Sequence, residues 1–179
     1  HSMGGRNAMA FAAMFPERIA QLVVEDMGPE KRENAHLYYE GLLGSIPTPF
    51  ASRTTAKNFF ENEFALRVKT KENPKVLSQF LYANLEEKAD GSLDWRFSAA
   101  GIILSVKDGR TQDRWSDIPK ITAPTLIIRG AESTEFSKES YNKMLEINPL
   151  FEGIEIPNAG HWVHSEQPEE FLAAIKRFT

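Results

Sequence analysis

The first five residues hold the group with the clearest potential for chemistry, a serine followed closely by glycines. The chain opens His1-Ser2-Met3-Gly4-Gly5, and an apolar stretch follows at once. A serine on a sharp turn into a helix is typical of a nucleophile elbow, where a small residue such as Gly4 lets backbones approach closely. At the N-terminus of that helix, the Met3 backbone N–H could stabilise a developing oxyanion. A lone S-x-G also occurs by chance, so the interpretation depends on a base for the serine.

A candidate base lies near the other end of the chain. His161 follows Asn158-Ala159-Gly160, directly after a predicted strand and before the last predicted helix. A histidine in such a loop can reach over the carboxyl edge of a sheet and take the proton of a serine hydroxyl. His164, three residues later, is more typical of a packing or capping residue.

The other two histidines fit non-catalytic positions. We expect His1 to line a pocket wall or a strand end beside Ser2, and His36 to lie on the surface. The pair that could do nucleophilic chemistry is therefore Ser2 and His161.

The elements that would position these residues alternate between helix and strand at both ends of the chain. Apolar spacing predicts helices over 4–15 and 138–147 and a final helix beginning near Pro168. Runs of β-branched and apolar residues predict strands over 19–24, 125–128 and 154–156. Strands that alternate with helices indicate an α/β fold with a parallel sheet.

The middle of the chain does not follow this alternation. Residues 30–118 show helical patterning around 35–43, 55–68, 75–85 and 97–104, separated by proline and glycine turns. We interpret this stretch as a helical insertion. The predicted organisation is an α/β core built from 1–29 and 119–179, with the insertion between them.

Four motifs occur in an order that resembles one known family. Ser-Met-Gly-Gly opens the chain, P-E-R-I follows the first helix, A-P-T-L-I-I-R-G begins the second α/β block, and N-A-G-H-W-V-H-S-E-Q-P-E-E-F lies near the end. This pattern resembles the α/β-hydrolase family. The resemblance implies the C-terminal part of that fold, a parallel sheet flanked by helices, with the insertion as a helical cap or lid. It also implies Ser2 as nucleophile, His161 as base and the Met3 N–H as an oxyanion donor.

The acid that orients His161 has three candidates. Family members most often carry an aspartate three residues beyond the glycine that here is Gly130, but this position holds Ser133, flanked by Glu132 and Glu135. A minority arrangement takes the acid from the end of the preceding strand, roughly two dozen residues after the nucleophile. Asp26 fits that position. We favour Asp26, with Glu132 and Glu135 as alternatives; Asp26 could otherwise cap the turn before Gly28-Pro29.

Composition limits the other kinds of chemistry. The chain has 179 residues, a formal net charge of −4 and no cysteine, which excludes disulfides, thiol nucleophiles and cysteine-based metal sites. Its mild acidity disfavours nucleic acid and anionic membranes as partners. Its apolar runs are far shorter than the roughly 20 residues that span a bilayer.

These features together predict a serine hydrolase for a carboxylic ester, thioester or lactone of a small to medium, mainly neutral acyl compound. No metal or organic cofactor is expected, and the cap, 30–118, is expected to bind substrate. Alternatives are a C–C bond hydrolase, a lyase or a perhydrolase on the same fold, or a hydrolase-like module that binds a small molecule without turnover. Because no strand precedes His1, we expect a missing N-terminal portion of the same protein; a cytoplasmic location is expected.

Overall fold

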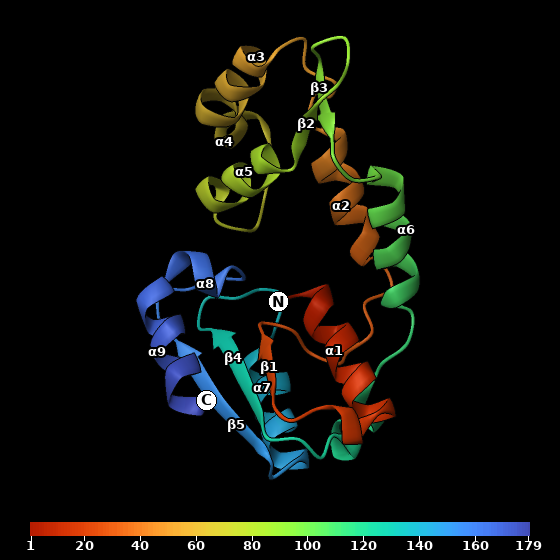
Figure 1. Cartoon of the computed structure of the whole chain (residues 1–179), viewed down its shortest axis with the longest axis vertical. Helices are drawn as coiled ribbons and strands as arrows, with labels where there is room; N and C mark the ends of the chain where they lie inside the picture. The colour runs from red at the N-terminus through yellow and green to blue at the C-terminus, as the bar shows by residue number, and fades with distance from the viewer. The chain divides into compact units, whose positions relative to one another are not determined.

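The computed structural model describes all 179 residues, which divide into two compact units (Figure 1). The first unit combines His1–Lys31 with Gln112–Thr179, and the second is Arg32–Thr111. The insertion predicted from the sequence spans residues 30–118. In the structure, residues 112–118 belong to the first unit.

The first unit contains three strands, four α-helices and two 3₁₀ turns. In chain order they are α1 (Met3–Met14), η1 (Pro16–Arg18), β1 (Leu22–Glu25), η3 (Trp115–Lys120), β4 (Thr125–Gly130), α7 (Lys138–Ile147), β5 (Phe151–Ile156), α8 (Val163–Glu166) and α9 (Pro168–Phe178). Each helix and strand predicted for this part of the chain is present. β5 begins three residues earlier than predicted, because Glu152 and Gly153 interrupt its apolar pattern.

The three strands form one parallel sheet in the order β1-β4-β5. Glu25 pairs with Ile128, and Gly130 pairs with Ile156, so all three strands end at the same edge. The loops that follow the strands therefore meet there. This edge is where parallel sheets commonly place their functional groups.

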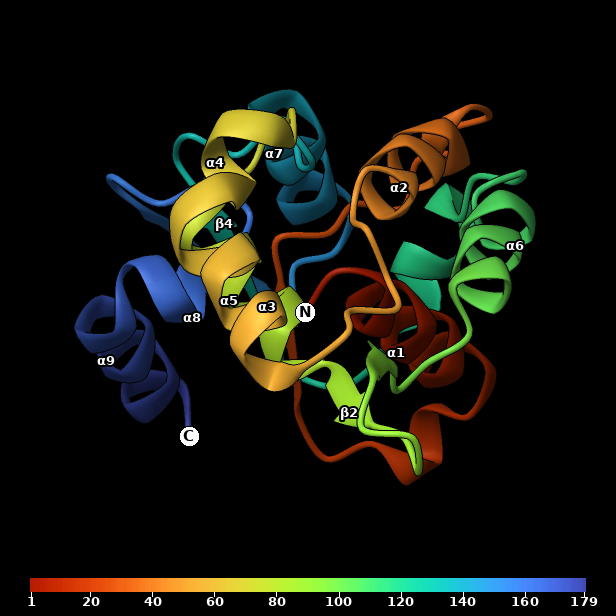
Figure 2. The same ribbon diagram turned by 90° about the horizontal axis from the view of Figure 1, so that it is seen from above.

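Helices cover both faces of the sheet, which explains why β4 is buried at all six positions (Figures 1 and 2). Ile127 faces a cluster with α1 and α7, including Met9 and Met144. Leu126 and Ile128 face a second cluster with α8 and α9. The alternation follows from the two-residue period of a strand, and it makes β4 the centre of the core.

A buried arginine on α1 holds the two points where the chain leaves and re-enters the first unit. Arg6 is 3% exposed, and its guanidinium donates to the carbonyl oxygens of Glu30, at 3.2 Å, and Gln112. These carbonyls lie just before and just after the second unit. A single side chain therefore links both connections.

The second unit is mainly helical. Its elements are α2 (Ala35–Gly44), α3 (Arg53–Asn58), the π-helical turn η2 (Phe59–Glu63), α4 (Phe64–Arg67), α5 (Pro74–Ala83), β2 (Leu85–Glu87), β3 (Leu93–Trp95) and α6 (Ala99–Gly109). In both views α2 and α6 lie side by side (Figures 1 and 2). The aromatic residues Phe50, Phe59, Phe60 and Phe64 are buried and contact one another, so they form the core of this unit.

The hairpin β2–β3 is absent from the sequence prediction, which identified only its turn. Gly91 has φ of 83°, and Asp90 accepts hydrogen bonds from the backbone and hydroxyl of Ser92. Each strand has only three residues, too few for an alternating pattern to stand out. No helix in either unit has both the length and the apolar character needed to cross a membrane.

Candidate active site

Ser2 occupies a strained turn at the start of α1. Its φ of 52° and ψ of −130° lie where non-glycine residues are uncommon. Its backbone N–H donates to the carbonyl of Glu25, at 3.1 Å, which ties the turn to the end of β1. Met3 is the first residue of α1, and the first N–H groups of a helix have no acceptor within it. The turn thus places Ser2 next to the first backbone N–H groups of α1, which have no acceptor within the helix.

The glycine that allows the close approach of helix and strand is Gly5 rather than Gly4. A Cβ at Gly5 would lie 3.1 Å from Val24 and 3.4 Å from Met27, whereas a Cβ at Gly4 would meet nothing within 4 Å in this chain. Within this chain α1 therefore packs on β1 through Gly5, and the role expected for Gly4 stays a prediction.

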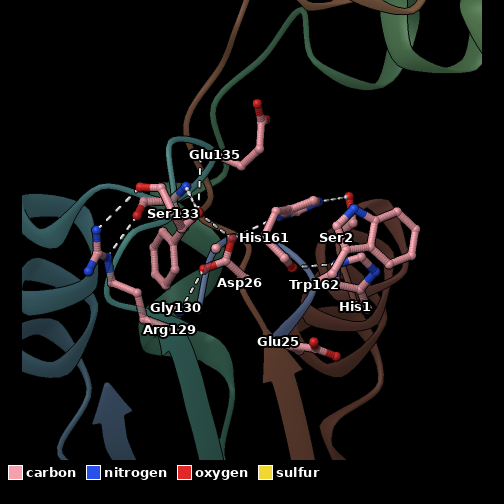
Figure 3. A network of polar contacts seen from close by, with 12 residues as sticks. His1, Ser2, Glu25, Asp26, Arg129, Gly130, Ser133, Glu135, His161 and Trp162 are labelled. Carbon is pink, nitrogen blue, oxygen red and sulfur yellow. Dashed lines mark hydrogen bonds and ion pairs between the residues drawn. The ribbon is translucent and has the colours of Figure 1, made fainter. Parts of the chain in front are cut away.

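His161 lies between Ser2 and Asp26 (Figure 3). Its Nε2 is 3.0 Å from the Ser2 Oγ, and its Nδ1 is 2.8 Å from Asp26 Oδ2. An ionised carboxylate only accepts hydrogen bonds, so Nδ1 carries the proton and Nε2 is free to accept from the serine hydroxyl. His161 is 6% exposed, which keeps bulk water away from most of the ring.

Asp26 is fully buried at the end of β1, with φ of 48°. Its Oδ1 accepts from the backbone N–H of Gly130, at 3.0 Å. Its Oδ2 accepts from the Ser133 hydroxyl, at 2.5 Å, as well as from His161. A buried carboxylate requires such donors, because an unpaired buried charge is very costly.

Ser133 lies where the family resemblance leads one to look for the acid, and it acts instead as a donor to Asp26. The same hydroxyl oxygen accepts from the backbone N–H groups of Glu135, at 3.1 Å, and Phe136, at 3.2 Å. Ser133 therefore joins the loop after β4 to the carboxylate at the end of β1.

Arg129 binds the backbone of that loop. Its guanidinium donates to the carbonyls of Phe136, Ala131 and Ser133 and forms an ion pair with Glu155 at 2.6 Å. Burial alone would raise the pKa of Glu155, but hydrogen bonds from Lys138 and Arg129 outweigh it and lower the pKa. The charge network thus fixes the loop that carries Ser133.

The two alternative acids lie elsewhere on the loop. Glu132 is exposed, and its backbone N–H donates to the carbonyl oxygen of Ala159. Glu135 is 8% exposed, and Figure 3 shows its carboxylate directed away from the Asp26–His161 pair. Of the three candidates, the structure brings Asp26 into contact with His161.

The remaining histidines take other partners. His1 Nε2 donates to the carbonyl of His161, at 2.8 Å, and its ring contacts Trp162. His164 contacts Glu25 through Nδ1, at 2.7 Å. His36 is half-buried on α2, in the second unit.

Sequence reasoning missed three residues that support the site. Gly130 and Ser133 donate hydrogen bonds to Asp26, and Arg129 holds the loop that carries Ser133. The sequence pointed to Gly130 and Ser133 only as the place where an acid is usually found. The location of Ser133 three residues after Gly130 was the available signal. No group of three or more His, Asp or Glu side chains is placed to hold a metal ion.

The first unit has a parallel sheet that is covered by helices. Ser2 at the start of α1 lies beside His161, which follows β5, and His161 contacts Asp26, which follows β1. These features define an α/β protein with a Ser–His–Asp constellation. The comparison with known families gives the same class. The sequence profile of the α/β hydrolase family matches residues 1–174. The chain belongs to this family.

Individual relatives cover the whole chain. It is 30% identical over 99% of its length to the sn-1-specific diacylglycerol lipase ABHD11 of Danio rerio, and covers 55% of that protein. It is 29% identical to the esterase YbfF of Escherichia coli, of which it covers 65%. A solved marine microorganism esterase superposes with a TM-score of 0.81 at 28% identity, over 100% of this chain and 68% of that one. The chain thus spans between about half and two thirds of these curated relatives.

Proposed function

We propose that this chain carries the nucleophile, base and acid of a serine hydrolase that cleaves a carboxylic ester, or a related thioester or lactone. The observation that carries the proposal is the line of contacts from Ser2 Oγ through the His161 ring to buried Asp26, at 3.0 and 2.8 Å. The names of the relatives, an esterase and a diacylglycerol lipase, support ester substrates. Because the chain spans only part of these relatives, we place the activity in the whole protein.

The proposed reaction has two halves. The Ser2 hydroxyl attacks the ester carbonyl as His161 Nε2 takes its proton, and the Met3 N–H donates to the oxyanion. The alcohol leaves with the proton from Nε2, and an acyl-serine remains. Water then attacks the acyl-serine, gives its proton to Nε2 and releases the acid, and Ser2 regains its proton. Asp26 holds the His161 tautomer and stabilises the imidazolium throughout.

The second unit, Arg32–Thr111, is proposed as the helical cap that selects the substrate. Its support is its place in the sequence, between the end of the β1 segment and the strand that leads to Ser133. The helical content of this unit and its own aromatic core agree with such a role.

The test is covalent labelling of the full-length protein with a fluorophosphonate. Wild-type protein should be labelled at Ser2, identified by peptide mass spectrometry, and should hydrolyse an aryl ester. Ser2→Ala should abolish labelling and lower kcat on the order of 10⁶-fold, because no other group replaces the nucleophile. Ser105 is an exposed serine on α6, and Ser105→Ala is the matched control. This variant should still be labelled at Ser2 and should hydrolyse the aryl ester.

Labelling that persists in Ser2→Ala would contradict the proposal. Faster turnover of a vinylogous diketone than of an aryl ester would instead move the activity to C–C bond hydrolysis by the same residues.

A further inference from the structure

A second histidine–carboxylate pair lies beside the proposed triad and takes no part in the reaction as written. Glu25, the last residue of β1, is 6% exposed. Its Oε1 accepts two hydrogen bonds from one residue, the backbone N–H of His164, at 3.0 Å, and its ring Nδ1, at 2.7 Å. Since the carboxylate can only accept, His164 carries its proton on Nδ1.

The backbone of Glu25 holds the nucleophile turn at the same time. Its carbonyl accepts from the Ser2 N–H, at 3.1 Å. One residue thus touches both loops of the site, the Ser2 turn through its main chain and the start of α8 through its side chain. Figure 3 shows the carboxylates of Glu25 and Asp26 diverging from the same strand end.

The loop that carries His161 needs such an anchor because α8 is only four residues long and its N-cap residue, Trp162, provides no side-chain cap. Glu166 supplies one carboxylate, which accepts from the N–H groups of Gly160 and Trp162. Glu25 supplies a second from another element, the sheet. Buried Val163 fixes the segment against the core between these anchors.

We propose that Glu25 and His164 form a positioning pair that sets the distance between His161 Nε2 and Ser2 Oγ. Glu25 connects the two loops, so movement of either loop relative to the other requires breaking its contacts. A displacement of about 1 Å can lower a catalysed rate on the order of 100-fold, because proton transfer needs close alignment. The inference rests on the proposed function, but its geometry can be tested without turnover.

The kinetic test uses the full-length protein. Glu25→Ala and His164→Ala should each lower kcat about tenfold with KM within about twofold, because substrate contacts are retained and alignment is lost. Glu25→Gln keeps an acceptor for both His164 donors and should restore kcat to within about threefold of wild type. The double variant Glu25→Ala/His164→Ala should be no slower than the slower single variant, as expected for one coupled unit. Glu152→Ala, an exposed glutamate on β5, is the matched control.

The second readout is the Nδ1 proton of His161 in NMR spectra of histidine-labelled protein. Glu25→Ala should shift or broaden this signal, although Glu25 does not bond to His161, and Glu152→Ala should leave it unchanged. If Glu25→Ala does not fold, His164→Leu serves for both measurements.

Wild-type kcat in Glu25→Ala, loss of thermal stability alone, or an unchanged His161 signal would overturn the inference. If Ser2→Ala retains activity, the proposed function fails and the His161 signal still decides whether the pair positions that histidine.

Discussion

Ser2 and Asp26 both hold backbone conformations that side chains usually avoid, with φ of 52° and 48°. Only one other non-glycine residue in the chain, Asn158, shares this feature, and it lies on the loop that leads to His161. Such conformations cost about 1–3 kcal/mol each and persist where surrounding contacts determine them. Here those contacts are the hydrogen bonds that join the strand ends.

The identity of the acid is tested by a pair of conservative substitutions in the full-length protein. Asp26→Asn should lower kcat on the order of 10⁴-fold, because the amide no longer favours the His161 tautomer with its proton on Nδ1. Glu132→Gln should leave kcat within about twofold, since Glu132 is exposed. Steady-state kinetics on an aryl ester measure both, and a larger loss in Glu132→Gln than in Asp26→Asn would move the acid to the later loop.

Ser2 and His161 could be chosen from the sequence because each lies beside a recognisable element, and the family resemblance supported both. Asp26 was chosen from that resemblance, which gives a spacing from the nucleophile that Asp26 fits. The partners of Asp26 could not be chosen this way. The Ser133 hydroxyl reaches Asp26 across 107 positions of sequence, and a serine in a polar loop has many possible partners. Only the fold determines which one it takes.

At the scale of elements, the site depends on how closely the β4 end approaches the loop after β5. A Cβ on Gly130 would lie 2.0 Å from the carbonyl oxygen of Gly160 and 2.6 Å from that of Ala159. Both atoms belong to the backbone, so they cannot rotate away. The glycine at position 130 is therefore required by packing against the backbone of the loop after β5.

Gly130→Ala should displace the loop that carries His161 and weaken the N–H contact from residue 130 to Asp26. We expect a loss of about 1–3 kcal/mol in the free energy of unfolding, as for other overpacked sites, and a kcat at least tenfold lower, by the alignment argument. Thermal unfolding and ester kinetics measure the two effects.

Gly41→Ala is the control for this substitution. Gly41 lies inside α2, where a Cβ would meet nothing within 4 Å. Alanine there should stabilise the helix by about 0.4–1 kcal/mol and leave kcat unchanged. Wild-type kcat in Gly130→Ala would show that the loop accommodates the extra methyl group.

The ion pair between β4 and β5 gives stability a pH dependence. The pKa of Glu155 is lowered from 4.5 in the folded protein, because hydrogen bonds from Lys138 and Arg129 outweigh the effect of burial. A lowered pKa means that the stabilisation is present above pH 4.5 and is lost as the pH falls through the folded-state value. Glu155→Gln should therefore be less stable than wild type near neutral pH, and the difference should shrink on acidification.

Urea unfolding of wild type and Glu155→Gln, from neutral pH down to below pH 4.5, measures the difference in their free energies of unfolding. A gap that stays constant or widens as the pH falls would contradict the assignment of the charge to Glu155.

The strands and helices of the first unit were predictable because apolar runs and helical spacing mark them clearly. Short or interrupted elements were harder to predict from the sequence. Three-residue strands such as β2 and β3 carry too little pattern, and the π-helical turn η2 within the predicted helix 55–68 has no sequence signature that spacing can detect. Local patterns therefore define the sheet better than the helical unit.

For the whole molecule, the sequence indicated an α/β core interrupted by a helical segment, and the structure divides into a sheet-containing unit and a mainly helical one. The positions of the junctions were less predictable. Residues 112–118 are mostly polar and show no strand or helix periodicity in the sequence, but Ile118 is fully buried in the core of the first unit. Burial of that kind depends on long-range packing, which periodicity does not report.

The two carbonyls held by Arg6 have a consequence for how this sequence can change over evolution. Across the junction, Arg32 N–H donates to the carbonyl of Arg110, at 2.9 Å, so the ends of the second unit are also held together on its own side. Loop-closure entropy rises only slowly with length, by about 0.6 kcal/mol for each doubling. A segment of very different length or sequence could therefore replace Arg32–Thr111 at little thermodynamic cost, while the residues around Ser2 kept their geometry. With the roles proposed above for the two units, substrate selection and bond cleavage could then diverge independently.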